Sequence, residues 1–170
     1  MNDLLDIVDD QDRPIAKKER QWFYATDNHH FRVVNLFIQN DDKKILITKR
    51  SNKCEVFPNL YDFSAGGHVR SSETYEMAMS RELYEELGII SNDFIEIGYF
   101  PYPNPLGTFC FSKLYYLTDN YESCEISNSI QNMNFYPVEE IFALLHQAPH
   151  RFKSDFSPLF NYFIEWSNSR

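Results

Sequence analysis

Glycine is rare in this chain, and its placement restricts the fold more than any other feature. Only five glycines occur in 170 residues, although proteins contain about 7% glycine on average, yet Gly66, Gly67 and Gly88 fall in one short window. Helix-forming residues fill this window, and Gly88 is a good C-terminal stop. We expect a helix capped by Ser72, with acidic residues near its positive end.

Three carboxylates share one face of this expected helix. Glu82, Glu85 and Glu86 stand at i, i+3 and i+4, and about 100° of rotation per residue brings them together. Like charges at this spacing destabilise a helix by roughly 0.2 to 0.5 kcal/mol per pair. The cluster is therefore either a solvated acidic stripe or a cation site, and carboxylate oxygens suit Mg²⁺ or Mn²⁺.

Strands and helices interleave along the rest of the chain. The expected strands are an N-terminal hairpin at about 3–18, a second hairpin of 31–38 and 44–48, a short strand at 60–65, two strands at 94–102 and 108–117, and a last strand at 133–136. Helices are expected at 138–147 and 154–167, and the polar stretch 119–131 is expected to be a loop. This order predicts an α+β fold, an α/β/α sandwich with a mixed sheet between helices, in one domain spanning 1–170.

The charge balance limits the partners of this chain. Sixteen Lys and Arg against 25 Asp and Glu give a formal net charge of -9, so the average field repels nucleic-acid polymers and anionic membranes. Small phosphate-bearing substrates stay compatible with this charge if a metal ion or a few cationic side chains reverse the field locally.

The sequence also bears on location and assembly. No run approaches the ~18 apolar residues of a membrane span, and the three cysteines form no C-x-x-C pair. Together with the lack of an N-terminal apolar signal region, these features favour the cytoplasm. A homodimer is one option for the oligomeric state.

The segment from Gly67 to Ile89 resembles the Nudix box, G-x₅-E-x₇-R-E-U-x-E-E-x-G-U, where U is a bulky aliphatic residue. Every fixed position matches: Gly67, Glu73, Arg81, Glu82, Leu83, Glu85, Glu86, Gly88 and Ile89. The run FYPVEEIFALL near the end is also similar to that family. The resemblance implies the Nudix fold, a loop-helix-loop that holds divalent cations, and hydrolysis of diphosphate linkages in small nucleoside-diphosphate-type molecules.

The resemblance also implies roles for individual residues. Glu82, Glu85 and Glu86 become metal ligands and catalytic residues, and the Gly67 carbonyl becomes a further ligand for Mg²⁺ or Mn²⁺. Arg81 forms an ion pair with Glu73 that orients the helix, while Leu83, Leu87 and Ile89 are packing positions. The general base stays open among Glu85, Glu86, Glu122, Glu125 and Glu139.

The N-terminal half resembles the branch of the family that includes isopentenyl-diphosphate isomerase. His30 and His68 match two metal-binding His positions of those enzymes, but Gly66 stands where they carry a catalytic Cys. The chain is therefore more similar to the bacterial isomerase-like Nudix hydrolases. An isomerase and a non-catalytic ligand-binding module remain the alternatives.

Several further side chains are candidates for substrate contact. Arg50 and Lys53 follow a predicted strand and suit phosphate, and His30 joins them as a substrate-binding candidate. His68 is either a metal or phosphate contact or a loop histidine in a polar niche. The aromatic residues Phe100, Tyr102 and Phe109 are expected in the core, with stacking on a substrate as the alternative.

Overall fold

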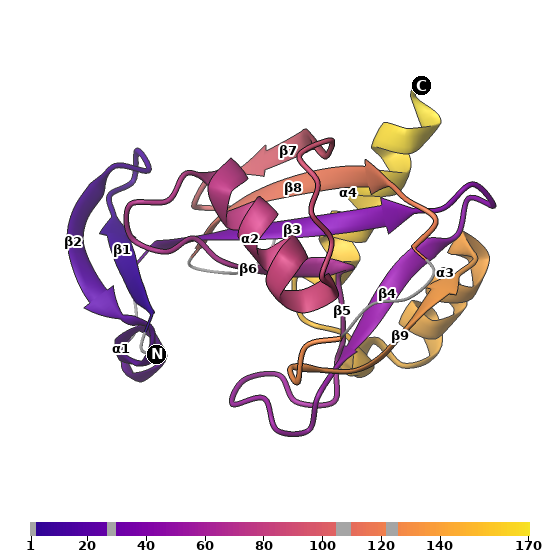
Figure 1. The fold of residues 1–170 in the computed structure, drawn as a ribbon, viewed down its shortest axis with the longest axis horizontal. Helices are drawn as coiled ribbons and strands as arrows, with labels where there is room; N and C mark the ends of the chain where they lie inside the picture. Colours follow the sequence, from indigo (N-terminus) through magenta and orange to yellow (C-terminus); the bar gives the residue numbers. More distant parts are fainter. Residues whose placement is uncertain (1–2, 27–29, 105–109, 122–125) are drawn as a thin grey trace.

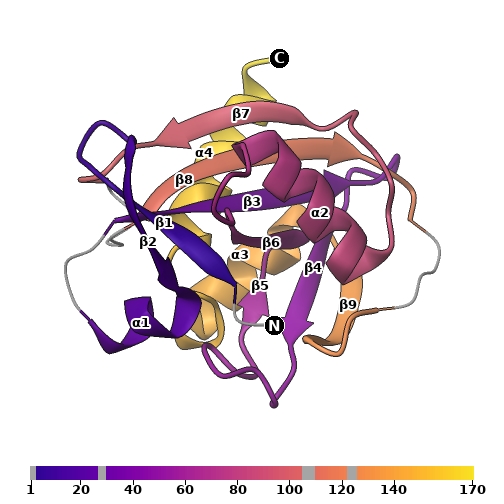
Figure 2. The ribbon, with the colours of Figure 1, turned by 60° about the vertical axis from the view of Figure 1, so that its left-hand side comes forward.

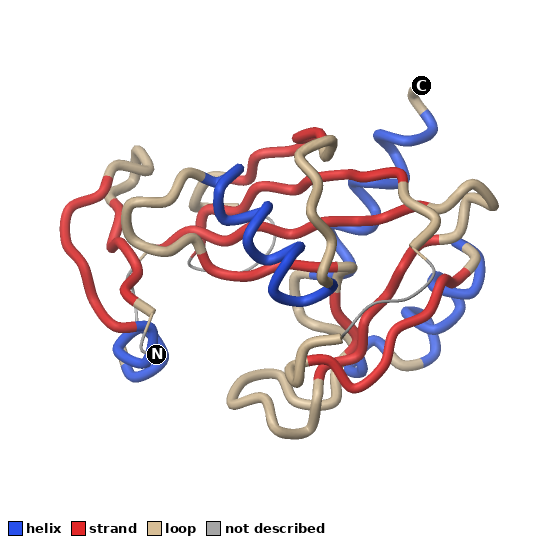
Figure 3. Tube along the Cα trace, in the orientation of Figure 1, coloured by secondary structure: helices blue, strands red, loops and turns tan. Residues whose placement is uncertain are grey.

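The computed structural model describes residues 3–26, 30–104, 110–121 and 126–170. A mixed sheet forms its centre, with helices on both faces (Figures 1 and 3). The strands are β1 (Leu4–Val8), β2 (Pro14–Glu19), β3 (Phe31–Gln39), β4 (Ile45–Arg50), β5 (Tyr61–Asp62), β6 (Ala65–His68), β7 (Ile95–Phe100), β8 (Cys110–Thr118) and β9 (Ile130–Tyr136). The helices are α1 (Arg20–Ala25), α2 (Tyr75–Leu87), α3 (Val138–Gln147), the short 3₁₀ helix η1 (Pro149–Arg151) and α4 (Phe156–Asn168).

The strand β3 organises the central sheet, in which β5, β4, β3, β8 and β7 follow one another. It runs parallel to β8 along its whole length and antiparallel to β6 over Val33–Leu36. The strand β4 meets β3 only at the pair Gln39 and Ile45, and then pairs with β9 and β5. The predicted second hairpin is therefore paired at its turn only, because β6 occupies the edge of β3 beyond it.

Alternation along β3 produces the two faces of the sandwich. Val34, Leu36 and Ile38 pack with Met79 and Leu83 of α2 in one buried cluster. On the other face, Phe37 packs against the aromatic side chains of α4, with Ile141 of α3 nearby. Figure 1 shows α2 in front of the sheet and α4 behind it. The predicted α/β/α sandwich with a central mixed sheet is confirmed.

The helix α2 begins later than the sequence predicts. Ser72 has a left-handed backbone, with φ of 74°, so it lies in the loop, and the Oγ1 atom of Thr74 caps the helix by accepting from the Met77 amide at 3.2 Å. The stop at Gly88 is confirmed, since its φ is 67° and its amide donates to the Tyr84 carbonyl. The predicted packing roles of Leu83 and Leu87 are also confirmed, because both are fully buried.

Other boundaries differ from the prediction in small ways. The expected strand at 60–65 is split into β5 and β6, and β9 begins at Ile130 inside the expected loop. The helix α1 was not predicted, because its six residues are too few to show a helical period.

The strands β1 and β2 and the helix α1 form an N-terminal unit at one end of the sheet (Figure 2). Leu5, Ile7 and Phe23 form its small core. The turn of the hairpin is tied to the main sheet through Asp12, which accepts from Arg32 at 2.6 Å and from Tyr75 at 2.8 Å. No helix in the described residues is long and apolar enough to cross a membrane.

Candidate functional site

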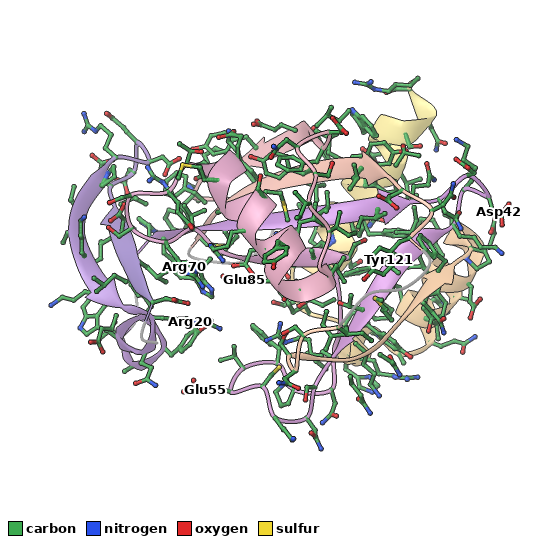
Figure 4. All side chains as sticks on the ribbon, in the orientation of Figure 1. Arg20, Asp42, Glu55, Arg70, Glu85 and Tyr121 are labelled. Carbon is green, nitrogen blue, oxygen red and sulfur yellow. The ribbon has the colours of Figure 1, made fainter. Side chains whose placement is uncertain are left out.

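A cavity of about 320 Å³ lies between the N-terminal unit, the β6–α2 segment and the loop that follows β4. The side chains of α1 and of the residues just before α4 complete its walls. Figure 4 shows Arg20 on the side of the N-terminal unit and Glu85 on the side of α2, with Glu55 on the loop below. The cavity therefore combines segments from the beginning, the middle and the end of the chain.

Two glycines of β6 contact carboxylates of α2, and Gly67 leaves the space that Glu82 occupies. A Cβ atom at residue 67 would lie 2.5 Å from the carboxyl carbon of Glu82, which no real structure accommodates without movement. The Gly66 amide donates to Glu86 Oε2 at 3.0 Å. Gly66 and Gly67 therefore hold two carboxylates of α2 directly against the backbone of β6.

Arg81 connects α2 to the loop before it. Its guanidinium donates to both oxygens of Glu73, at 2.7 and 2.8 Å, and to the His68 carbonyl at 2.9 Å. Burial would lower the pKa of Arg81, but Glu73 and Glu82 outweigh it and raise that pKa. The expected Arg81–Glu73 ion pair is confirmed.

The three glutamates of α2 lie in different environments. Glu82 accepts from Arg81 at 2.6 Å, and the more exposed Glu85 pairs with Arg70 at 3.1 Å. Burial, together with the charge of Glu82, raises the pKa of Glu86 to about 8, and burial also raises the pKa of Glu82. Within the described residues, no three His, Cys, Asp or Glu side chains converge as a ready set of metal ligands.

The donor set nevertheless fits a hard divalent cation. Glu82 and Glu86 are half-buried carboxylates that lie against glycine backbone, and the pKa of each is raised because partial burial without a cation favours the protonated form. A bound cation reverses that preference, and carboxylate oxygens with a nearby carbonyl are the ligands that Mg²⁺ and Mn²⁺ accept. Gly67, Glu82 and Glu86 are the residues that would hold it.

Comparison with known proteins decides the family. The family model described as NUDIX domain matches residues 29–160. The chain belongs to the Nudix hydrolase family. An uncharacterized Nudix hydrolase of Nostoc sp. is 39% identical over 165 residues, which are 95% of each chain. The crystal structure of DR0079 from Deinococcus radiodurans superposes with a TM-score of 0.82 and 28% identity, covering 93% of this chain and 97% of that one.

The name of a third relative includes a substrate class. A prenyl-diphosphate phosphatase of Methanosarcina mazei is 35% identical over 86 residues, which are 51% of this chain and 49% of that protein. The Nudix domain and the similarity to Nudix hydrolases show that this chain is a hydrolase that acts on pyrophosphate bonds.

His68 lies in the wall of the Nudix cavity, while His30 does not. The half-buried His68 ring stacks on Phe31 with centroids 5.3 Å apart. Burial and the nearby cations, Arg20 foremost, lower its pKa to about 3, so the imidazole is neutral at physiological pH. His30 stacks on Tyr102, with centroids 4.0 Å apart, and its Nε2 lies 3.4 Å from an Asp10 carboxylate oxygen.

Of the two predicted phosphate contacts, only one lines the cavity. Arg50 lines the cavity and donates to Asp62 at 3.0 Å, whereas Lys53 lies outside the lining. Of the candidate bases, Glu139 lies on α3 away from the cavity, and Glu122 and Glu125 lie outside the described residues.

The aromatic residues that were expected in the core are described only in part. Phe100 packs on Tyr162 in the core, with centroids 5.0 Å apart, as expected, whereas Phe109 lies outside the described residues.

Sequence reasoning missed several cavity residues, among them Arg20, Tyr24, Lys153 and Asp155. Arg20 and Tyr24 stand four apart on α1, which was itself not predicted. Lys153 and Asp155 precede α4. An Asp at the start of a helix is a recognisable sequence feature, but it indicates helix capping rather than a place in a cavity.

Proposed function

We propose that this chain is a divalent-cation-dependent hydrolase that cleaves a diphosphate linkage in a small molecule of the nucleoside-diphosphate type. The observation that carries the proposal is the pair of half-buried carboxylates, Glu82 and Glu86, held against Gly66 and Gly67 in the wall of a cavity. The same cavity carries the cations Arg20 and Arg50, which offset the negative charge of the chain where a phosphate would bind.

The proposed roles follow from these positions. When bound, a divalent cation neutralises phosphate charge and lowers the pKa of an attacking water. Glu82 and Glu86, with the Gly67 carbonyl, hold the cation, and Arg81 keeps α2 in register with the loop through Glu73. Glu85, half-exposed at the rim and paired with Arg70, is the proposed general base, because its carboxylate is less buried than the other two.

His68 and Arg50 contribute to the substrate side of the site. The neutral His68 imidazole presents a lone pair to the metal or a hydrogen bond to a phosphate oxygen. Arg50 adds positive charge to the cavity wall, although Asp62 and the Val56 carbonyl accept its hydrogen bonds in this structure. The proposed contacts of Lys53 and His30, which lie outside the lining, require their side chains to act from the edge of the site.

The test is release of phosphate or pyrophosphate by the full chain. The panel consists of nucleoside diphosphates, nucleoside diphosphate sugars, dinucleotides and isoprenoid diphosphates, each with Mg²⁺, with Mn²⁺ and with EDTA. Release from at least one class that EDTA abolishes is the expected result. Release that is insensitive to EDTA, or none from any class, contradicts the proposal.

The same compounds separate the proposed function from a second substrate class and from two other functions, when conversion and binding are measured beside phosphate release. The prenyl-diphosphate phosphatase of Methanosarcina mazei makes isoprenoid diphosphates the second substrate class to test. Conversion of isopentenyl to dimethylallyl diphosphate without phosphate release would instead indicate an isomerase. Saturable binding without any turnover would indicate a ligand-binding module.

We further propose a single domain, a cytoplasmic location and a homodimer in solution. Size-exclusion chromatography with light scattering measures the mass of the protein in solution, and a homodimer has twice the 20.2 kDa of one chain. Fractionation of the producing cell tests the location.

A further inference from the structure

The cavity has a second polar wall that the proposed chemistry does not use. Lys153, Ser154 and Asp155 contribute to it from the segment just before α4. The Lys153 amide donates to the Tyr61 carbonyl at 3.0 Å, and Phe152 and Phe156 on either side pack with ring centroids 4.9 Å apart. This segment is therefore fixed by the sheet and by the aromatic core, and its polar side chains are held in place.

The ammonium group of Lys153 has two acidic partners at long distance and lies over the Phe63 ring, with Nζ 5.0 Å from the ring centroid. Its Nζ lies 3.4 Å from Asp62 Oδ1 and 3.7 Å from Asp155 Oδ1. Both distances exceed the roughly 2.7 to 2.9 Å of a charge-assisted hydrogen bond. The side chain is 19% exposed, so its donors face the cavity rather than bulk solvent. Lys153 thus retains hydrogen-bond donors for a ligand.

Asp155 supplies an acceptor beside these donors. Its side chain is 6% exposed, and Oδ1 has no hydrogen-bond partner among the described residues. A buried polar atom without a partner is costly, and a native structure rarely keeps one without a use. The lysine and the aspartate therefore offer an unused donor and an unused acceptor on one wall.

The charges around this wall favour a neutral polar ligand. Lys153 carries one positive charge and Asp155 one negative charge, so the pair has no excess charge with which to attract an anion. The neighbouring Asp62 is paired with Arg50. The hydroxyls of Ser127 and Ser129 lie on the same cavity. A group that both donates and accepts hydrogen bonds matches this set, and a sugar hydroxyl does both.

We propose that Lys153 and Asp155 are specificity-determining residues that bind hydroxyl groups on the organic part of the substrate. This inference rests on the proposed hydrolase, in which Glu82 and Glu86 serve the diphosphate. A prenyl chain has no hydroxyl group and would leave Lys153 and Asp155 without partners. The pair thus selects polyol-bearing diphosphates over isoprenoid ones, since sites with buried polar groups discriminate strongly against ligands that lack the matching group.

The first test changes the substrate and leaves the protein intact. Wild-type enzyme with Mg²⁺ is given uridine diphosphate, its 2′,3′-dideoxy analogue and dimethylallyl diphosphate, and KM and kcat are measured for each. We expect KM to rise about tenfold or more when the ribose hydroxyls are absent, with kcat little changed, and dimethylallyl diphosphate to be the poorest of the three.

The second test changes the residues. Asp155→Asn and Lys153→Met are each expected to raise KM for uridine diphosphate about tenfold and to leave KM for the dideoxy analogue unchanged. Lys113→Met is the matched control, because Lys113 is also 19% exposed and pairs with two acids but does not line the cavity. If either variant fails to fold, the comparison of substrates on the wild type still decides.

The outcomes separate the inference from the function on which it rests. Equal KM values for uridine diphosphate and its dideoxy analogue overturn the inference and leave the hydrolase intact. The same holds if dimethylallyl diphosphate is the best substrate, or if the variants change KM equally for both nucleotides. If none of the three releases phosphate with Mg²⁺, the proposed function fails for these diphosphates, and the inference fails with it.

Discussion

Arg81 and Glu73 face each other through two parallel hydrogen bonds, from Nε to Oε1 at 2.7 Å and from Nη2 to Oε2 at 2.8 Å. Arg81→Lys keeps the charge but loses this planar fork. We expect the free energy of unfolding to fall by about 2 kcal/mol, which lowers the melting temperature by roughly 4 to 8 °C. Arg13→Lys, on the exposed pair with Asp9, is the control and should melt like the wild type. Equal melting of the two variants contradicts a structural role for the fork.

Gly67→Ala tests the contact between β6 and Glu82. The new Cβ would lie 2.5 Å from the Glu82 carboxyl carbon, so the carboxylate must move away. We expect turnover to fall by about 10² and the Mg²⁺ concentration for half-maximal activity to rise, because one proposed ligand is displaced. Gly98→Ala is the control, since its Cβ is blocked by Phe100 and Tyr162 at 2.8 Å, away from the cavity. It should lower stability and leave the Mg²⁺ requirement unchanged.

Glu82→Gln and Glu86→Gln test the half-buried carboxylates themselves. Each is expected to lower turnover by ~10² or more while circular dichroism shows an unchanged fold, because the amide is nearly isosteric but neutral. Glu76→Gln is the control on the same helix, where Glu76 is exposed and pairs with Lys113. Wild-type turnover in both Glu82→Gln and Glu86→Gln would remove the basis of the metal assignment.

The local pattern of the chain predicts α2, and the resemblance to the Nudix box implies the pairing of Arg81 with Glu73. Both were found because they depend on residues close in sequence. The glutamates share a face at helical spacing, and Gly88 supplies the left-handed stop. Ser72 was the wrong cap because both Ser72 and Thr74 suit that role, and only the loop conformation, with φ of 74° at Ser72, decides between them.

The rest of the site could not be predicted because it depends on long-range placement. Lys153 and Asp155 reach the cavity through the packing of α4 on the sheet, and no local pattern announces that arrangement. Arg20 reaches it through the N-terminal unit. His30 and Lys53 match or follow recognisable patterns, yet the structure places neither on the cavity. The resemblance to the Nudix box thus supplied the proposed metal ligands but not the opposite wall.

Substitution of Asp12 tests how strongly the N-terminal unit is attached to the rest of the fold. Asp12 has a left-handed backbone, with φ of 60°, and accepts hydrogen bonds from Arg32, Tyr75 and Tyr99. Asp12→Ala removes these acceptors and is strained at positive φ, so we expect a loss of roughly 2 to 4 kcal/mol and faster amide exchange over residues 3–19. Tyr99→Phe removes one hydrogen bond and should cost about 1 kcal/mol. Unchanged exchange in Asp12→Ala would show that the hairpin is held by its apolar core instead.

The stability of the metal-free protein should fall as the pH rises from about 6.5 to about 8. Glu86 has an ordinary pKa of 4.5 when unfolded and about 8 when folded, since burial and the charge of Glu82 oppose its ionisation. Within this window the folded state keeps a proton that the unfolded state has released, so each step upward in pH favours unfolding. The raised pKa values of Glu82 and Asp155 act in the same direction. The lowered pKa of His68 acts in the opposite direction between about pH 3 and 6.5, so the fall should be seen above pH 6.5, and the lowered pKa of Glu73 acts below pH 4.5.

Thermal melts in EDTA at pH 5, 6.5 and 8 measure this dependence. Glu86→Gln should flatten it and should melt above the wild type at pH 8, because the neutral amide still accepts the Gly66 hydrogen bond. Saturating Mg²⁺ should restore the wild type at pH 8 much more than at pH 5, since the cation displaces the proton. A wild-type stability that rises from pH 6.5 to pH 8 in EDTA, with Glu86→Gln following it, would show that Glu86 is ionised in the folded protein without a cation.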